Sequence, residues 1–172
     1  EDPARWAEIE QKRAYAWVDS YGKTLSKKEG RLFAADCAAH VLHFFEEIHT
    51  ADPRPRQAID AVRAQAKRKA TKEQMQAATR RARATTDGTA EMEYEDTGPT
   101  QIANLPLAAH WAAAASASLL EETAITAASA ATNAAVWGAT GPASIARAAE
   151  RVWQWRCLLT YLQGQSMKKG AK

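Results

Sequence analysis

Two arginines in the first half of the chain are placed where an anion could bind. The segment Asp52-Pro-Arg-Pro-Arg56 puts their guanidinium groups at the predicted start of a helix. The macrodipole makes that end of a helix positive, so cations are unfavourable there unless an anion joins them. The anion is either a carboxylate of the chain, with Asp52, Glu46 and Glu47 as candidates, or an external phosphate or carboxylate. Since the prolines restrict the loop, an external anion would find Arg54 and Arg56 already positioned.

A second set of side chains has residue types that can hold a divalent metal ion. Asp36, His40, His43 and Glu47 recur at intervals of four, three and four residues, which places them on one stripe of a helix. The H-E-x-x-H zinc motif instead needs two histidines four residues apart with a glutamate between them, and the chain lacks it. We therefore predict no metal and no cofactor, and we expect this polar stripe to face solvent or neighbouring arginines.

The charges of the chain are strongly segregated. Residues 54–83 hold ten basic and two acidic residues, whereas residues 84–138 hold no base and seven acids, within a net charge of +3. The cations between Lys67 and Arg83 could bind nucleic-acid phosphates, yet no glycine-rich loop, recognition-helix signature or interleaved aromatic residue accompanies them. We expect a solvated helix face here, and we do not expect a nucleic acid as partner.

No local pattern indicates catalysis. The chain has no G-x-S-x-G sequence and no cysteine–histidine–asparagine set with a known local signature. Cys37 and Cys157 lie in apolar surroundings without a C-x-x-C motif, which favours reduced thiols in the core over redox or metal chemistry. We expect a protein that is not an enzyme, and keep a helical enzyme of unknown reaction as an alternative.

The elements that must hold these residues are helices. Alanine accounts for 40 of the 172 residues and is the strongest helix former, while the runs of β-branched and aromatic residues typical of sheets are missing. We predict an all-α fold, a single domain over residues 1–172 built as a bundle of six or seven helices with a core of alanine and mostly buried tryptophan. No stretch approaches the 18 consecutive apolar residues of a membrane span, so we expect a cytoplasmic protein without a membrane partner.

Capping signals and helix breakers divide the chain into segments. Capping boxes of the S-x-x-E or T-x-x-Q type begin at Ser26, Thr71 and Ser118. The predicted helices cover residues 3–21, 27–49, 55–66, 71–86, 107–138 with a break near residue 118, and a last stretch from residue 142 onward.

Three further features of the predicted architecture concern its irregular parts and its last helix. We predict an irregular acidic loop over residues 87–106 and a flexible basic tail over residues 164–172. The last helix carries apolar residues at helical spacing, which predicts a buried stripe. These residues are Ile145, Ala148, Val152, Trp155, Leu159 and Leu162.

Three segments of the chain resemble a known family. They are CAAHVLHFFEE over residues 37–47, DPRPRQAIDAVR over residues 52–63 and ERVWQW over residues 150–155. They are similar to the C-A-x-x-V-x-x-x-F-E, D-x-R-P-R-x-A-I and E-R-x-W-Q patterns of immunity proteins from bacterial polymorphic toxin systems. The chain departs from this family at residues 67–70, where a glycine-containing turn is usual, in the loop over 87–106, and at its N-terminal end.

The resemblance implies an all-helical protein of bacterial or phage conflict that acts by binding, without catalytic residues. Our first hypothesis is that it neutralises a toxin or defence protein by forming a stoichiometric complex. The alternative is sequestration of a small anionic, nucleotide-type signal, with the two arginines on its phosphates and a Trp or His ring stacked on its base. The sequence leaves a homo-oligomer open. The candidate binding residues are Arg54, Arg56, Asp52, Asp60, Arg63, His40, His43 and Trp153.

Overall fold

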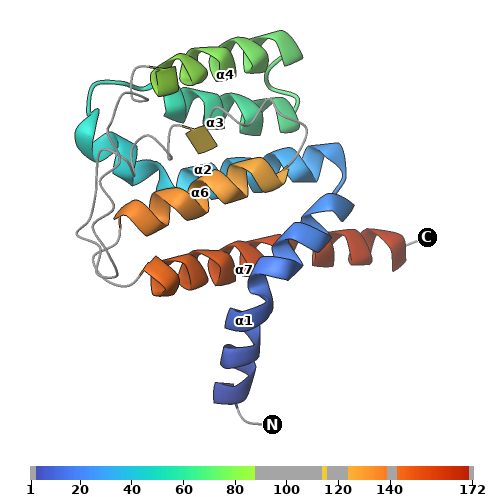
Figure 1. Ribbon diagram of the computed structural model, residues 1–172. Helices are drawn as coiled ribbons and strands as arrows, with labels where there is room; N and C mark the ends of the chain where they lie inside the picture. The colour runs from blue at the N-terminus through green and yellow to red at the C-terminus, as the bar shows by residue number, and fades with distance from the viewer. Residues whose placement is uncertain (1–2, 88–113, 116–123, 139–142, 171–172) are drawn as a thin grey trace.

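All regular elements among the described residues are helices (Figure 1). The computed structural model describes residues 3–87, 114–115, 124–138 and 143–170. In chain order the elements are α1 (Pro3–Tyr21), the short 3₁₀ helix η1 (Gly22–Thr24), α2 (Lys27–Ile48), α3 (Arg54–Ala66), α4 (Lys72–Asp87), α6 (Ala124–Gly138) and α7 (Ala143–Gly170). The predicted all-α bundle is confirmed. None of the described helices is long and apolar enough to cross a membrane.

Capping boxes start α2 and α4 where the sequence predicts them. The Ser26 hydroxyl accepts a hydrogen bond from the Glu29 N–H, and the Glu29 carboxylate accepts one from the Ser26 N–H, both at 3.3 Å. Thr71 and Gln74 form the same reciprocal pair before α4, at 3.2 and 2.8 Å. Each pair satisfies backbone N–H groups that a helix start leaves without an intrahelical partner.

The structure describes only part of the segments that the sequence predicts to be irregular. The loop after residue 87 and the predicted break at Ser118 lie outside the described residues. The segment 164–172, which we predicted as a flexible tail, is helical as far as Gly170 because α7 continues to that residue.

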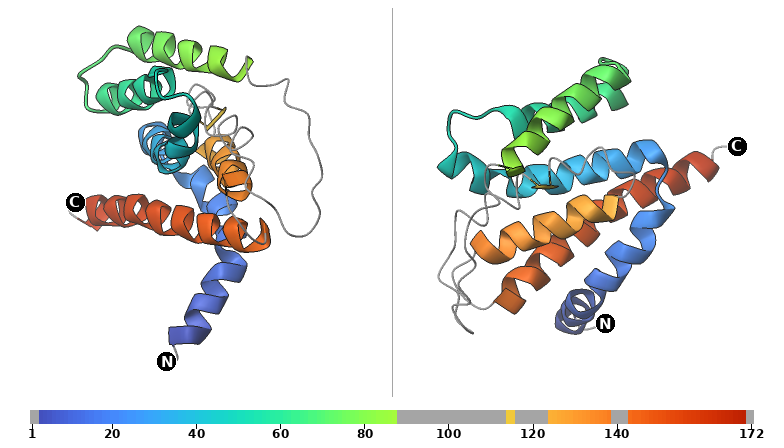
Figure 2. Two further views of the ribbon diagram at one scale, coloured as in Figure 1. Left: turned by 90° about the vertical axis from the view of Figure 1, so that its left-hand side faces the viewer. Right: turned by 45° about the horizontal axis from the view of Figure 1, so that its top comes forward.

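Helix α2 is the centre of the bundle. It packs on α6, α3 and α7, while α4 packs on α3 and α1 packs on α7. The views in Figures 1 and 2 show α4 and α3 at one end, α2 and α6 in the middle, and α7 with α1 at the other end. Alanines of α6 share the core with α2, and their small side chains let the two helices approach closely. The buried residues of α2 are Phe33, Ala34, Ala35, Cys37, Ala38, Val41, Leu42 and Phe45.

The described tryptophans lie at the rim of this core rather than inside it. Trp17, Trp137, Trp153 and Trp155 are all partly buried, and Trp153 and Trp155 pack against the core cluster. The indoles cover the edges of this core. The rings of Trp17 and Trp155, for example, lie with centroids 4.8 Å apart where α1 meets α7.

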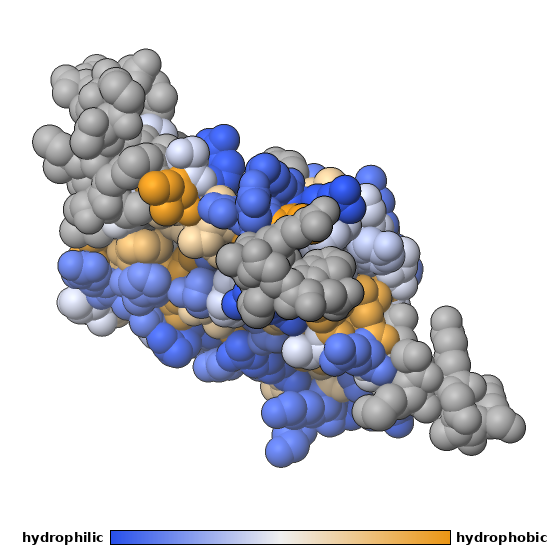
Figure 3. All heavy atoms as spheres, turned by 90° about the horizontal axis from the view of Figure 1, so that it is seen from below, coloured by the Kyte–Doolittle hydropathy of each residue, from blue (hydrophilic) through white to orange (hydrophobic). Residues whose placement is uncertain are grey.

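The buried face of α7 is not the predicted apolar stripe. Ile145 is 61% exposed, and the other members of the stripe are half-buried. The face of the molecule seen from below accordingly shows separate hydrophobic patches among hydrophilic residues (Figure 3). Polar side chains of α7 can be buried because α1, α2 and α6 present hydrogen-bond partners to them. The buried residues of α7 are Glu150, Arg151, Gln154 and Leu158.

Candidate binding site

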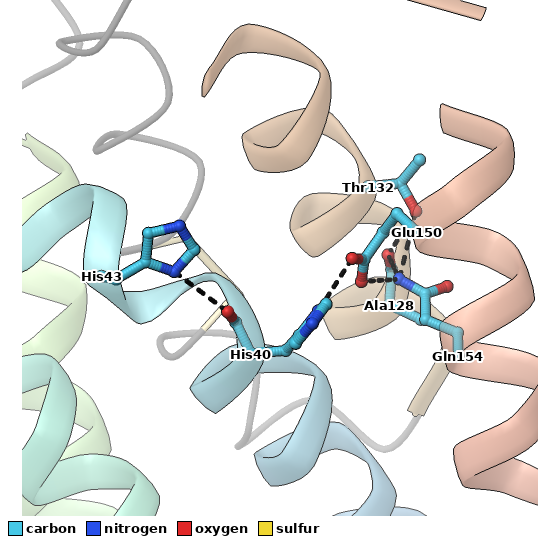
Figure 4. A network of polar contacts seen from close by, with 6 residues as sticks. All are labelled: His40, His43, Ala128, Thr132, Glu150 and Gln154. Atoms are coloured by element: carbon cyan, nitrogen blue, oxygen red, sulfur yellow. Dashed lines mark hydrogen bonds and ion pairs between the residues drawn. The ribbon is translucent and has the colours of Figure 1, made fainter. Parts of the chain in front are cut away.

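His40 of α2 is held on two sides by residues of α7. Its Nδ1 atom lies 2.9 Å from Glu150 Oε2, and its ring stacks on the indole of Trp153 with centroids 3.7 Å apart and planes inclined by 2°. Figure 4 shows the imidazole pointing from α2 toward the Glu150 carboxylate. Two separate contacts therefore fix both the position and the rotation of this ring.

The Glu150 carboxylate is braced from the interior by Gln154. The Glu150 side chain is 2% exposed, and its Oε1 atom accepts a hydrogen bond from Gln154 Nε2 at 2.8 Å. The same Nε2 atom donates to the Ala128 carbonyl at 2.8 Å and lies 3.2 Å from Thr132 Oγ1, which ties the pair to α6 (Figure 4). A buried carboxylate is tolerable only when such partners replace water.

The contact with Glu150 engages the Nδ1 atom of His40. An ionised carboxylate can only accept hydrogen bonds, so Nδ1 donates when Glu150 is ionised. The remaining nitrogen, Nε2, makes no hydrogen bond to any described residue. Since the His40 side chain is 39% exposed, the ring combines a buried anchor with a surface available to a binding partner.

Asp36, one turn earlier on α2, forms a second polar cluster with α3 and α7. Its carboxylate accepts hydrogen bonds from Arg63 Nη2 at 2.8 Å and from the Tyr161 hydroxyl, and Cys157 Sγ lies 4.0 Å away. Burial raises the pKa of Cys157 to about 12, and burial together with the hydrogen bond to Asp36 raises the pKa of Tyr161. Both groups therefore stay protonated near neutral pH, and the thiol is a poor nucleophile.

The two clusters lie along one contact between α2 and α7, which we call the α2–α7 seam. The side chains of Asp36 and Arg63 are 29% and 39% exposed, so this cluster, like His40, is partly open to solvent. Ordered polar and aromatic groups with a buried support are typical of protein-binding surfaces, because little side-chain entropy is lost on association. The seam consists of Asp36, His40, Arg63, Glu150, Trp153, Cys157 and Tyr161.

The two arginines of the Arg-Pro-Arg element have anions from the chain itself. Arg54 donates to Asp52 through Nε at 2.8 Å and Nη2 at 2.6 Å. Arg56 donates to Glu46 at 2.5 and 2.6 Å. Hydrogen bonds from the Arg54 side chain lower the pKa of Asp52. The sequence leaves open whether a carboxylate of the chain or an external anion pairs with these arginines. In the structure the carboxylates of Asp52 and Glu46 pair with them.

A hollow of about 400 Å³ lies beside Arg54 at the turn between α2 and α3. The Nε2 atom of His49 is buried and makes no hydrogen bond to the described residues. The hollow therefore brings together one guanidinium group, one carboxylate and one imidazole. The residues that line it are Ile48, His49, Thr50, Ala51, Asp52 and Arg54.

The structure does not gather the eight sequence-predicted binding residues into one pocket. Arg54 and Asp52 share the hollow, Arg56 and the exposed Asp60 lie on the outer side of α3, and Arg63 joins Asp36. His40 and Trp153 stack on each other, so a face of each ring is already occupied. His43 is exposed and its Nδ1 atom contacts the His40 carbonyl at 3.1 Å.

The four residues weighed as metal ligands also have separate surroundings. Asp36 is engaged by Arg63, and His40 by Glu150. Within the described part of the chain, no three His, Cys, Asp or Glu residues are grouped so as to hold a metal ion.

Sequence reasoning missed the residues that support the seam from inside. Glu150 and Gln154 lie four residues apart in the ERVWQW segment, a spacing that puts them on one face of a helix. The spacing of Glu150 and Gln154 thus indicates a shared helix face. Polar residues of an amphipathic helix are normally assigned to its solvent side, however, so this face is not identified as buried from the sequence.

A comparison with protein families finds one match to this chain. The model of a family described as "Imm-5 like putative immunity protein" matches residues 21–158. No curated protein and no solved structure is significantly similar to the chain.

Proposed function

The chain belongs to the family of Imm-5 like putative immunity proteins, and from this premise we propose that it neutralises a toxin or defence protein by forming a stoichiometric complex with it. The complex itself blocks the partner, and the chain performs no reaction.

The observation that carries the proposal is the meeting of all three family-like segments at the α2–α7 seam. Residues 37–47 contribute His40, residues 52–63 contribute Arg63, and residues 150–155 contribute Glu150 and Trp153. These segments are far apart in the sequence, and the fold brings one side chain or more from each to the same half-exposed surface. We infer that this surface contacts the partner.

The proposal is tested by co-producing the chain in bacteria with a panel of toxin domains. We expect one toxin to be tolerated only when the chain is present, and the purified pair to elute as a complex of fixed stoichiometry in chromatography with light scattering. Trp153→Ala should weaken this complex, whereas His43→Ala, on the same helix as His40 but outside the seam, should not. Circular dichroism of each variant separates a binding defect from a folding defect.

The mass of the toxin after co-production separates binding from enzymatic inactivation. We expect an unchanged mass and recovery of toxin activity when the complex is dissociated. Protection without a complex, or a toxin whose mass has changed, would overturn the proposal and favour the enzyme alternative.

The hollow at the α2–α3 turn supports a second candidate function, sequestration of a small anionic ligand. Arg54 offers a guanidinium group there, and the buried Nε2 atom of His49 has no hydrogen-bond partner among the described residues. Native mass spectrometry of the purified protein would reveal a co-purified anion. Inorganic phosphate or ATP should also raise the melting temperature of the wild type by mass action, but not that of Arg54→Ala. If neither probe changes the melting temperature and no anion co-purifies, this function is excluded.

A further inference from the structure

The structure sorts nine of the ten basic residues of the segment 54–83 into two groups. The arginines of α3, namely Arg54, Arg56 and Arg63, each contact a carboxylate. The cations of the α3–α4 turn and of α4 behave differently, because six of them are exposed and form no ion pair with any described residue. We call these six the α4 basic face. They are Lys67, Arg68, Lys69, Lys72, Arg80 and Arg81.

The position of α4 keeps this face open among the described helices. The helix packs on α3, and Figures 1 and 2 show it as the outermost helix at one end of the bundle. Its buried side chains all lie on the side toward α3, so the cations project from the other side or from its N-terminal end. The buried residues of α4 are Met75, Ala78, Thr79, Ala82 and Thr85.

The clustering of these charges carries a cost within the isolated chain. Lys72 and Arg80 lie eight residues apart, which is about 12 Å along a helix, and the three cations of the turn adjoin the same end. Neighbouring like charges on a helix surface repel each other. Some cations elsewhere in the fold contact a carboxylate, as Arg156 contacts Glu10 at 2.6 Å. The α4 basic face is offset by Glu73 and Asp87 alone on its own helix.

We propose that the α4 basic face docks an acidic surface of the protein that this chain neutralises. This inference rests on the proposed function and names the chemistry of the partner. A row of exposed cations attracts an acidic partner over a distance of about a Debye length and orients it before close contact forms. The face therefore acts mainly on the rate and specificity of association, while the α2–α7 seam provides short-range contacts.

Two observations favour an acidic protein surface over a nucleic acid. Residues 54–87 contain no aromatic residue, so the face offers no ring on which a base could stack. The chain as a whole carries a net charge of only +3, with seven acids and no base over residues 84–138 directly after this segment. A long polyanion responds to the net charge of the whole chain, which is small, whereas a compact acidic surface responds to the local cluster of cations.

The test compares two triple variants with the same change in charge. Lys72→Glu, Arg80→Glu and Arg81→Glu reverse the α4 basic face. Lys23→Glu, Lys27→Glu and Lys28→Glu reverse exposed cations of η1 and of the start of α2. With the toxin identified by the protection assay, we expect the first variant to associate about tenfold or more slowly at about 50 mM NaCl and to lose most of its dependence on salt. The second variant should stay close to the wild type.

The possible results distinguish a failure of this inference from a failure of the proposed function. If the wild type binds a toxin and both variants associate at the same rate, the docking role of α4 is wrong while the proposed function stands. If no toxin is bound, the proposed function fails, and the α4 basic face is tested with poly-L-glutamate and with a DNA duplex of about 20 base pairs. Salt-sensitive binding of poly-L-glutamate that only the α4 variant loses supports an acidic polypeptide partner. No such binding, or tighter binding of the duplex, overturns the inference.

Discussion

The imidazole of His40 lies parallel to the indole of Trp153, with ring centroids 3.7 Å apart and an angle of 2° between the planes. The stack joins the middle of α2 to the middle of α7, and the Nδ1 atom of the same imidazole reaches Glu150. One half-exposed ring thus covers a buried carboxylate and holds an indole in place. The seam depends on this contact for its shape.

Replacement of His40 should destabilise the fold through Glu150. In His40→Ala the buried carboxylate loses a hydrogen-bond partner, and we expect the free energy of unfolding to fall by about 1–3 kcal/mol. The matched control, His43→Ala, removes an exposed histidine of the same helix and should change it by no more than about 0.5 kcal/mol. Urea unfolding followed by circular dichroism measures both.

A double variant tests whether the loss of stability in His40→Ala arises from its contact with Glu150. When His40→Ala is combined with Glu150→Leu, the buried carboxylate that would lack its partner is also removed, so the double variant should be more stable than the sum of the two single effects predicts. Additive effects would show that His40 and Glu150 do not act as a pair.

Gly138 should be a position where a methyl group is not tolerated. A Cβ atom there would lie 2.1 Å from Phe44 Cε1 and 2.3 Å from Phe44 Cζ, so the Phe44 ring would have to leave its place against α6. We expect Gly138→Ala to lower the free energy of unfolding by about 1–3 kcal/mol.

The control for this substitution is Gly164→Ala in α7, where a Cβ atom would meet nothing within 4 Å. The loss of a helical glycine should there raise stability by about 0.5–1 kcal/mol. Thermal unfolding of the two variants should therefore shift in opposite directions, and equal shifts would contradict the close packing of α6 on α2.

Arg68 should be replaceable by glycine with a gain in stability. It has a φ of 58°, in the left-handed region that costs an L-residue about 1–2 kcal/mol. The N–H groups of Arg68 and Lys69 bond to the carbonyls of Gln65 and Ala64 at 2.9 and 2.8 Å, which is the Schellman arrangement that usually holds a glycine. Arg68→Gly should stabilise the protein by roughly 1 kcal/mol, whereas Lys69→Gly should not, as differential scanning calorimetry would show.

The pair of Asp52 and Arg54 should contribute stability that is lost in acid. Hydrogen bonds from the Arg54 side chain lower the pKa of Asp52 in the folded state, below the value of about 3.9 for an unfolded chain. The contribution is therefore complete above about pH 4 and disappears as the pH falls through the lowered pKa. Because the pair is partly exposed, we expect about 0.5–1 kcal/mol.

Stability curves between about pH 7 and pH 2 test this contribution. The wild type should be more stable than Asp52→Asn above pH 4, and the difference should vanish in strong acid. A pH-independent difference for Asp52→Asn would show that Arg54 is not its partner in solution.

The two cysteines should react slowly with thiol reagents in the native protein. Cys37 is fully buried and its pKa is raised by burial, and burial raises the pKa of Cys157 to about 12. At pH 8 we expect Cys157 to react with Ellman's reagent at least about a hundredfold more slowly than free cysteine, and Cys37 to react more slowly still. Both should react fully in urea, and a fast native reaction of either thiol would contradict the described packing.

Local features of the sequence predicted a large part of this fold. The capping boxes at Ser26 and Thr71 and the breaker Gly22 act between residues close in the chain, so the helix ends that they set could be placed without knowledge of the tertiary structure. The carboxylate partners of Arg54 and Arg56 were also among the candidates, since Asp52 and Glu46 are near them in sequence. Both cysteines are free in the structure, Cys37 buried and Cys157 partly buried.

The sequence by itself thus determined the helical class, most helix boundaries and the pattern of charge, because these follow from backbone propensity, capping and composition. Only the tertiary structure decided which face of α7 is buried. Glu150 is 110 residues from His40 and Gln154 is 26 residues from the Ala128 carbonyl, so their partners exist only once α2, α6 and α7 are packed together. A polar side chain is buried at acceptable cost when such partners replace water, and no pattern within one helix reveals whether another helix will provide them.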